Sequence, residues 1–166
     1  MGVTGINHVG ITVSDLDASI VFWRDVVGLE LAGSGEVAYP HLDEIIGLGP
    51  TRLRWAELLI PGQGLLELFQ YLQPLGSSRA GQRTADPGTV HLCLECDDLE
   101  SLLSRIRGSG YPSRTPAAVR IPFGDWQDWL SVYVSSPDGV TLELVQRPAG
   151  APPGVPGSAA GREALP

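Results

Sequence analysis

The stretch HVGITVSDLD, residues 8–17, returns later in the chain as HLCLECDDLE, residues 91–100. In both copies a histidine opens an alternating run, and an Asp-Leu-acid triplet follows seven residues later. The ends of the two halves also match, as LELFQ at residues 66–70 and LELVQ at residues 142–146. Two matches in the same order indicate an internal duplication, so we expect two modules that share one architecture.

The first half predicts a strand, a helix and further strands. Alternation of apolar and polar residues predicts a strand over residues 6–13. Apolar residues at helical spacing follow, with Ser14 as the expected N-cap and Gly28 as the expected end of the helix. A strand is expected to start near residues 29–32, whereas the region from there to residue 50 carries little signal.

The remaining elements repeat this order. In the second half, Asp97 is the expected N-cap of a helix that Gly108 and Gly110 stop. Each half should end in a hairpin, and the paired strands are residues 52–60 with 65–71 and residues 130–135 with 140–146. The fold class is therefore α+β.

The division of the chain follows from its composition. We expect a first module at residues 3–75, a polar connector at 76–88, a second module at 89–147 and a flexible Pro/Gly/Ala-rich tail at 148–166.

Charge and composition exclude several classes of function. The 166 residues carry 11 basic and 19 acidic side chains, a net charge of −8, which argues against a nucleic-acid partner or an anionic membrane surface. No apolar run reaches the length of a membrane span and no signal peptide is visible. Cys93 and Cys96 lie in a predicted strand and are expected to diverge as inert thiols, which makes the cytoplasm the simplest location.

Four polar residues stand inside apolar strands: His8, Glu67, His91 and Glu143. Taken singly, each has an ordinary structural interpretation. Duplication about a pseudo-twofold axis would bring all four together, however, and uncompensated titratable groups buried together are costly. Two imidazoles and two carboxylates suit a divalent transition metal with open positions for water or substrate.

The same stretches resemble the vicinal oxygen chelate superfamily, which includes glyoxalase I, methylmalonyl-CoA epimerase, extradiol dioxygenases and bleomycin- and fosfomycin-resistance proteins. The resemblance covers about residues 5–147. It implies two βαβββ modules that curve into a half-open, glyoxalase-like barrel around a metal, and many members are homodimers. We therefore expect a homodimer.

The resemblance implies that His8, Glu67, His91 and Glu143 are the ligands of a divalent ion such as Zn, Ni, Co, Fe or Mn. It also implies catalytic roles for Glu67 and Glu143. An acid at position 67 is typical of the glyoxalase and epimerase branches, in which a proton is taken from the carbon beside a metal-bound carbonyl of a small molecule. We therefore expect an isomerase, epimerase or lyase. An Fe(II) extradiol-type dioxygenase and a non-catalytic drug-binding resistance protein are the alternatives.

Aromatic residues near these strands are candidates for substrate binding. Phe69 and Tyr71 share the strand face of Glu67 by the period of two, and a loop before the last hairpin adds three more aromatic side chains. The candidate substrate-binding residues are Phe69, Tyr71, Phe123, Trp126 and Trp129.

Overall fold

The computed structural model describes residues 2–77 and 83–151 and divides the chain into two compact units. The first unit comprises residues 1–82 with 136–139, and the second comprises residues 83–135 with 140–166. The predicted tail from residue 152 onward, and residues 78–82 of the predicted connector, lie outside the described residues.

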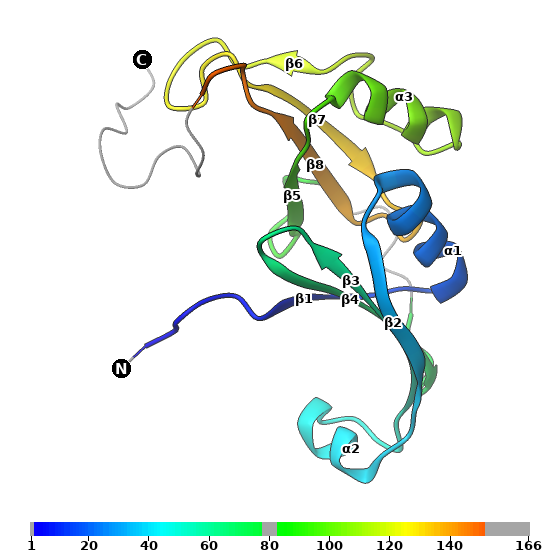
Figure 1. Cartoon of the computed structure of the whole chain (residues 1–166). Helices are drawn as coiled ribbons and strands as arrows, with labels where there is room; N and C mark the ends of the chain where they lie inside the picture. The colour runs from blue at the N-terminus through cyan, green and yellow to red at the C-terminus, as the bar shows by residue number, and fades with distance from the viewer. Residues whose placement is uncertain (1, 78–82, 152–166) are drawn as a thin grey trace. The chain divides into compact units, whose positions relative to one another are not determined.

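The first unit contains a mixed sheet and a helical segment (Figure 1). Its described strands pair in the order β1-β4-β3-β2, with β1 parallel to β4 and the other neighbours antiparallel. Its elements are β1 (His8–Thr12), α1 (Leu16–Ile20), the π-helical η1 (Val21–Val27), β2 (Glu30–Val37), α2 (Pro40–Ile46), β3 (Arg52–Ile60) and β4 (Gly64–Gln73).

The second unit repeats this topology. Its described strands pair in the order β5-β8-β7-β6, again with the first pair parallel and the others antiparallel. Its elements are β5 (His91–Glu95), α3 (Leu99–Gly108), β6 (Val119–Arg120), β7 (Leu130–Ser135) and β8 (Thr141–Gln146). The prediction of an α+β fold built from two βαβββ-like modules is confirmed.

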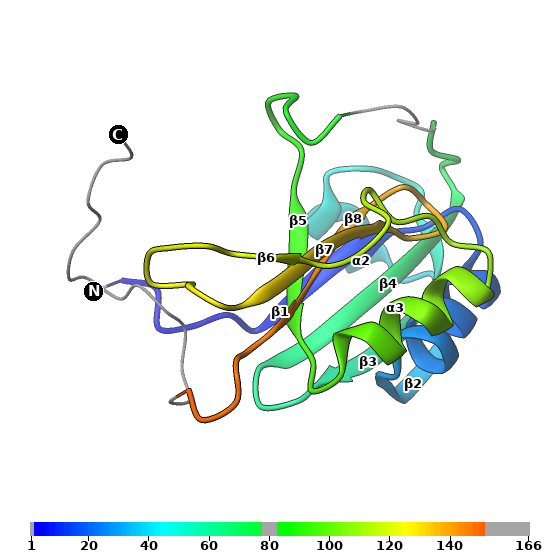
Figure 2. The ribbon, with the colours of Figure 1, turned by 90° about the horizontal axis from the view of Figure 1, so that it is seen from above.

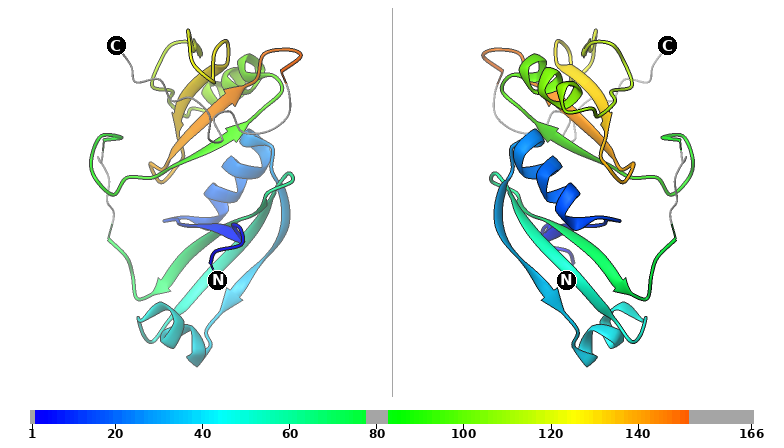
Figure 3. Two further views of the ribbon diagram at one scale, coloured as in Figure 1. Left: turned by 90° about the vertical axis from the view of Figure 1, so that its left-hand side faces the viewer. Right: turned by 90° about the vertical axis from the view of Figure 1, so that its right-hand side faces the viewer.

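One face of each sheet is apolar and is covered by the helix of the same unit. In the first unit, Phe22 and Trp23 of η1 are fully buried, as are Leu66 and Leu68 of β4; Figure 3 shows α1 and η1 running beside the β3–β4 hairpin. In the second unit, α3 contacts β8 (Figure 2), and its buried stripe is Leu99, Leu102, Leu103 and Ile106. This arrangement leaves the opposite face of each sheet for polar side chains.

Both helix caps lie one residue later than predicted. The Asp15 carboxylate accepts a hydrogen bond from Ala18 N at 3.1 Å, so Asp15 and not Ser14 is the N-cap of α1. Asp98 and not Asp97 caps α3, where its carboxylate accepts from Ser101 N at 3.0 Å. Each helix starts at the residue after this aspartate, so the earlier side chain is too far from the N–H groups of the first turn. Gly28 ends η1 in the left-handed conformation, as predicted.

Two short elements were not predicted. Helix α2 contains no buried residue and therefore has no apolar stripe that periodicity could detect. Strand β6 has two residues, both exposed. Among the described residues, no helix is both long and apolar enough to cross a membrane.

Candidate functional site

The first unit brings His8 and Glu67 together on the polar face of its sheet. His8 is the Cα partner of Leu65 in the parallel pairing of β1 with β4, so Glu67 lies two residues further along the same face. The His8 Nε2 and Glu67 Oε2 atoms are 3.2 Å apart, and their side chains are 44% and 19% exposed. The other imidazole nitrogen, Nδ1, lies 2.8 Å from Asn7 Oδ1. An amide oxygen only accepts, so Nδ1 donates and Nε2 is the atom left to face Glu67.

The second unit builds the same pair from β5 and β8. His91 is the Cα partner of Thr141, which again places the acid, Glu143, two residues along the same face. The His91 Nε2 and Glu143 Oε2 atoms are 3.1 Å apart, and their side chains are 43% and 20% exposed. The predicted histidine–glutamate partners are therefore neighbours within each unit, with matching separation and exposure.

The donor atoms of each pair suit a metal ion. Two ligands about 2.1 Å from an ion and about 90° apart are themselves about 3.0 Å apart, close to the 3.2 and 3.1 Å found here. Imidazole nitrogen and carboxylate oxygen are ligands that first-row divalent ions accept. Within either unit, the described residues contain no group of three or more His, Cys, Asp or Glu side chains arranged to hold a metal. Each unit thus presents one histidine–glutamate pair.

Several side chains surround the Glu143 carboxylate. Ser131 Oγ donates a hydrogen bond to Glu143 Oε1 at 2.9 Å. Tyr133 is the Cα partner of Glu143 on β7, and its ring centroid is 5.4 Å from that of His91. Burial first, and then the negative charge of Glu143, raise the pKa of the Tyr133 phenol. The same two causes raise the pKa of the Cys93 thiol to about 12, so this thiol is protonated at neutral pH.

The Glu67 carboxylate has different neighbours. It lines a hollow of about 150 Å³ together with Trp55, Ala56, Glu57 and Phe69. Glu57 is the Cα partner of Glu67, so the two carboxylates share one face of the β3–β4 hairpin. None of the hydrogen bonds or ion pairs found among the described residues involves the Glu57 carboxylate.

Sequence reasoning missed Glu57, because a lone glutamate in a strand usually points to solvent. The hairpin register contained the signal: counting equally back and forward from Gly62 in the turn pairs Glu57 with Glu67.

The predicted aromatic residues of the first unit occupy the same face as Glu67. Phe69 lines the hollow. Tyr71 is half-buried two residues further along β4 and is the Cα partner of Leu53.

The three candidate aromatic residues of the second unit differ in burial and in packing. Trp129 is 4% exposed and packs edge-to-face against Trp126, with 4.7 Å between ring centroids. The Arg147 guanidinium lies 5.1 Å from the Trp129 ring centroid. Phe123 is 60% exposed. Substrate contact by these three aromatic residues stays a prediction.

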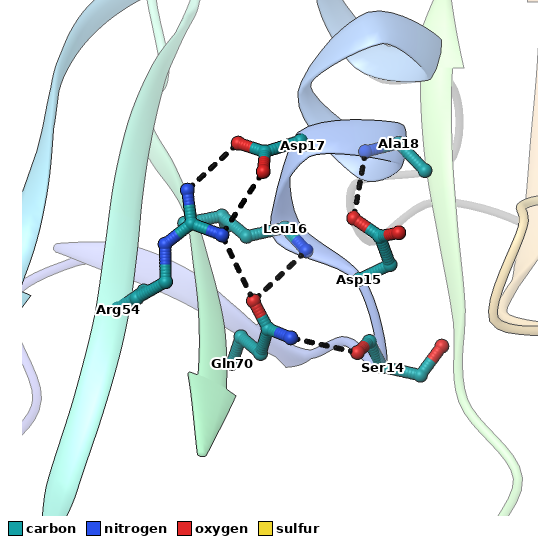
Figure 4. A network of polar contacts seen from close by, with 7 residues as sticks. All are labelled: Ser14, Asp15, Leu16, Asp17, Ala18, Arg54 and Gln70. Atoms are coloured by element: carbon teal, nitrogen blue, oxygen red, sulfur yellow. Dashed lines mark hydrogen bonds and ion pairs between the residues drawn. The ribbon is translucent and has the colours of Figure 1, made fainter. Parts of the chain in front are cut away.

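The repeated glutamine has a structural role in both units. Gln70 Oε1 accepts from Leu16 N at 3.3 Å and from Arg54 Nη1 at 3.3 Å, and Gln70 Nε2 donates to the carbonyl of Ser14 at 2.9 Å (Figure 4). Gln146 Oε1 likewise accepts from Leu99 N at 2.9 Å. Each glutamine therefore ties the last strand of its unit to the start of the helix.

Comparison with known proteins identifies the family of this chain. Residues 5–144 match the glyoxalase/bleomycin resistance protein/dioxygenase superfamily. A 2-epi-5-epi-valiolone epimerase from Actinomyces sp. is 31% identical over 160 residues, which cover 91% of this chain and 84% of the relative. The uncharacterized protein YaeR of Escherichia coli (strain K12) is 24% identical over 147 residues, covering 89% of this chain and 99% of that protein.

Solved structures show the same fold. A glyoxalase family protein from Bacillus cereus superposes with a TM-score of 0.73 at 22% identity, covering 88% of this chain and 95% of that one. The fosfomycin resistance protein FosX from Listeria monocytogenes, solved with Mn(II) and sulfate, gives a TM-score of 0.60 at 16% identity, with coverage of 89% and 96%. The profile match alone spans most of the sequence. The chain therefore belongs to the glyoxalase/bleomycin resistance protein/dioxygenase superfamily.

Proposed function

We propose that this protein is a metal-dependent epimerase or isomerase that moves a proton at a carbon beside a carbonyl group of a small oxygenated molecule. The observation that carries the proposal is the repeated histidine–glutamate pair, with Nε2–Oε2 separations of 3.2 and 3.1 Å in the two units. The epimerase relative, at 31% identity, supports the isomerase branch over the lyase branch.

His8, Glu67, His91 and Glu143 would together hold one divalent ion, within one chain or across a dimer. When bound, such an ion supplies Lewis-acid polarisation of a carbonyl group and so acidifies the neighbouring C–H bond. The FosX structure with Mn(II) is an example of this fold with a metal. Zn, Ni, Co, Fe and Mn remain the candidates here.

The chain's carboxylates would move the proton. Inversion of a stereocentre needs one group to remove a proton and another to return it to the opposite face. Glu67 and Glu143 are the pair proposed for this exchange. Glu57 adds a third candidate, because its carboxylate lines the same hollow as Glu67. Among the described residues it has no hydrogen bond or ion pair that would have to break when it takes up a proton.

Deuterium exchange tests the proposal. Protein reconstituted with each candidate metal would be incubated with 2-epi-5-epi-valiolone in D₂O, and proton NMR would follow deuterium entry beside the ketone. We expect exchange with the wild type and a rate roughly 10²–10⁴-fold lower with Glu67→Gln, which keeps an oxygen donor but loses the basic charge.

The same experiment separates the alternatives. Oxygen uptake that Glu67→Gln leaves unchanged, without exchange, would favour the Fe(II) dioxygenase. Tight ligand binding without metal, exchange or oxygen uptake would favour the binding protein. The proposed homodimer is tested separately by light scattering of the purified protein.

A further inference from the structure

The hollow beside Glu67 has a distinctive chemistry. Two aromatic side chains, Trp55 and Phe69, and two carboxylates, Glu57 and Glu67, line it, and none of its described lining residues is cationic. The nearby arginines of β3 are engaged elsewhere, since Arg52 pairs with Glu36 at 2.6 Å and Arg54 pairs with Asp17 at 2.7 Å. Its volume of about 150 Å³ is below the roughly 300–1,000 Å³ of sites for drug-sized ligands.

Trp55 occupies its position because residue 35 has no side chain. A Cβ atom at Gly35 would lie 3.0 Å from Trp55 Nε1 and 3.1 Å from both Cε2 and Cζ2. Such contacts are tighter than most that real Cβ atoms make, so a methyl group there would push the indole aside by a few tenths of an ångström. A Cβ at Gly33, on the same face of β2, would make ordinary contact with the far end of the ring at 3.5 Å.

Phe69 lies over a second glycine. A Cβ at Gly10 on β1 would lie 3.4 Å from Phe69 Cε2. Trp55 and Phe69 are also Cα partners in the β3–β4 pairing. The two rings therefore form one aromatic wall, defined here as Trp55 and Phe69, which extends from Gly35 to Gly10 across the polar face of the sheet.

At the corresponding register positions of the second unit, no aromatic pair is present. The residues at the corresponding register positions are Ser131 and Val145, which are Cα partners of each other, and Cys93, which is the Cα partner of Glu143. The aromatic wall is therefore a feature that the first unit has beyond the shared histidine–glutamate pair.

We propose that the aromatic wall and the carboxylates of Glu57 and Glu67 select a compact, uncharged, hydroxylated ring as the substrate, an inference that rests on the proposed function. The negative faces of the two aromatic rings attract the C–H groups of a saturated ring. Carboxylates accept hydrogen bonds from hydroxyl groups. A bound divalent ion would offset the charges of its two proposed carboxylate ligands, Glu67 and Glu143, so the charge left in the hollow is that of Glu57. That remaining negative charge disfavours phosphorylated or carboxylated molecules of the same shape, and the small hollow disfavours long thioester carriers.

Calorimetric titration of the metal-loaded protein tests this assignment. The probes are 2-epi-5-epi-valiolone and a phosphate monoester of the same compound. We expect the wild type to bind the uncharged ketone at least tenfold more tightly than the ester. Trp55→Ala should weaken ketone binding by about tenfold and Gly35→Ala should weaken it by a smaller factor, whereas the matched control Gly33→Ala should bind within about twofold of the wild type.

The possible outcomes distinguish failure of the substrate-binding assignment from failure of the proposed function. If the ester binds as tightly as the ketone, if the wild type does not bind the ketone, or if Trp55→Ala and Gly35→Ala bind it as Gly33→Ala does, the assignment is overturned. If the wild type catalyses deuterium exchange but Trp55→Ala and Gly35→Ala bind the ketone as tightly as the wild type, the role of the aromatic wall is overturned and the proposed function stands. If the probes and variants bind in the expected order of affinity but the wild type catalyses no deuterium exchange, the role of the aromatic wall stands and the proposed function is overturned.

Discussion

The two units present the same histidine–glutamate pair on different surroundings. Glu143 is held by the Ser131 hydroxyl and lies beside the Tyr133 phenol and the Cys93 thiol. Glu67 shares its face with the Glu57 carboxylate and lines a hollow with aromatic walls. A duplicated sheet has thus kept its proposed metal-binding pair, while the strands next to it have diverged. We infer that the second unit positions Glu143 through its neighbours, whereas the first unit offers Glu67 a second carboxylate and an open hollow beside it.

Substitution of the residues that are the cross-strand partners of the two glutamates should have the largest effect on the rate of deuterium exchange. Glu57→Gln removes a carboxylate from the hollow, and we expect deuterium exchange to fall by roughly 10²–10⁴ if Glu57 carries the proton. Tyr133→Phe, at the same register position in the second unit, is the matched control and should lower the rate by less than about tenfold. Equal losses in both variants would contradict the proposed division of roles.

The apolar faces should respond equally in the two units. Leu66 and Leu142 occupy corresponding positions on β4 and β8, and each is 0% exposed. Leu66→Ala and Leu142→Ala should each lower the free energy of unfolding by about 2–5 kcal/mol, because each leaves a cavity in a packed core. Urea denaturation followed by circular dichroism measures this. A loss below about 1 kcal/mol in one variant would show that the two cores are not equivalent.

The repeated glutamines should differ modestly. Gln146 accepts one hydrogen bond from the start of its helix. Gln70 accepts one such bond from Leu16 N, donates one to the Ser14 carbonyl and accepts a third from Arg54 of β3. We expect Gln146→Ala to lower the free energy of unfolding by about 1 kcal/mol, a typical value for one hydrogen bond, and Gln70→Ala to lower it further. The same denaturation experiment checks the order, and a reversed order would contradict the assigned roles.

The smallest effect is expected at Arg54. Its ion pair with Asp17 joins two solvent-accessible side chains, 34% and 74% exposed, and such pairs contribute little to stability. Leu130 stands at the corresponding position of the second unit, since both residues are Cα partners of the repeated glutamine. Arg54→Ala should therefore leave the urea midpoint close to that of the wild type. A shift larger than that of Gln70→Ala would show that this ion pair is structurally important.

Elements marked by the internal repeat or by a hairpin turn could be predicted from the sequence. Strand β3 was predicted at its observed bounds, residues 52–60, because alternation and a Gly-rich turn both mark it. The helix caps were one residue early, although the repeat held a better signal: Asp15 and Asp98 are identical in the two copies, whereas Ser14 and Asp97 differ.

Features that depend on three-dimensional contacts could not be predicted in this way. The hollow beside Glu67 needs Trp55 close to Gly35, and no local pattern predicts that contact across neighbouring strands. The sequence predicted that all four residues, two histidines and two glutamates, meet at one metal ion, and did not single out a histidine–glutamate pair within each unit. The structure shows two such local pairs, one in each unit.

Metal content of the wild type and of two single variants tests the central claim most directly. If His8 and His91 bind the same ion, the wild type should hold one divalent ion per chain by mass spectrometry. His8→Ala and His91→Ala should each lose nearly all of it while circular dichroism stays unchanged, because apolar faces and not the metal stabilise the units. Two ions per chain in the wild type, with only one lost in each variant, would show two separate sites and contradict the account.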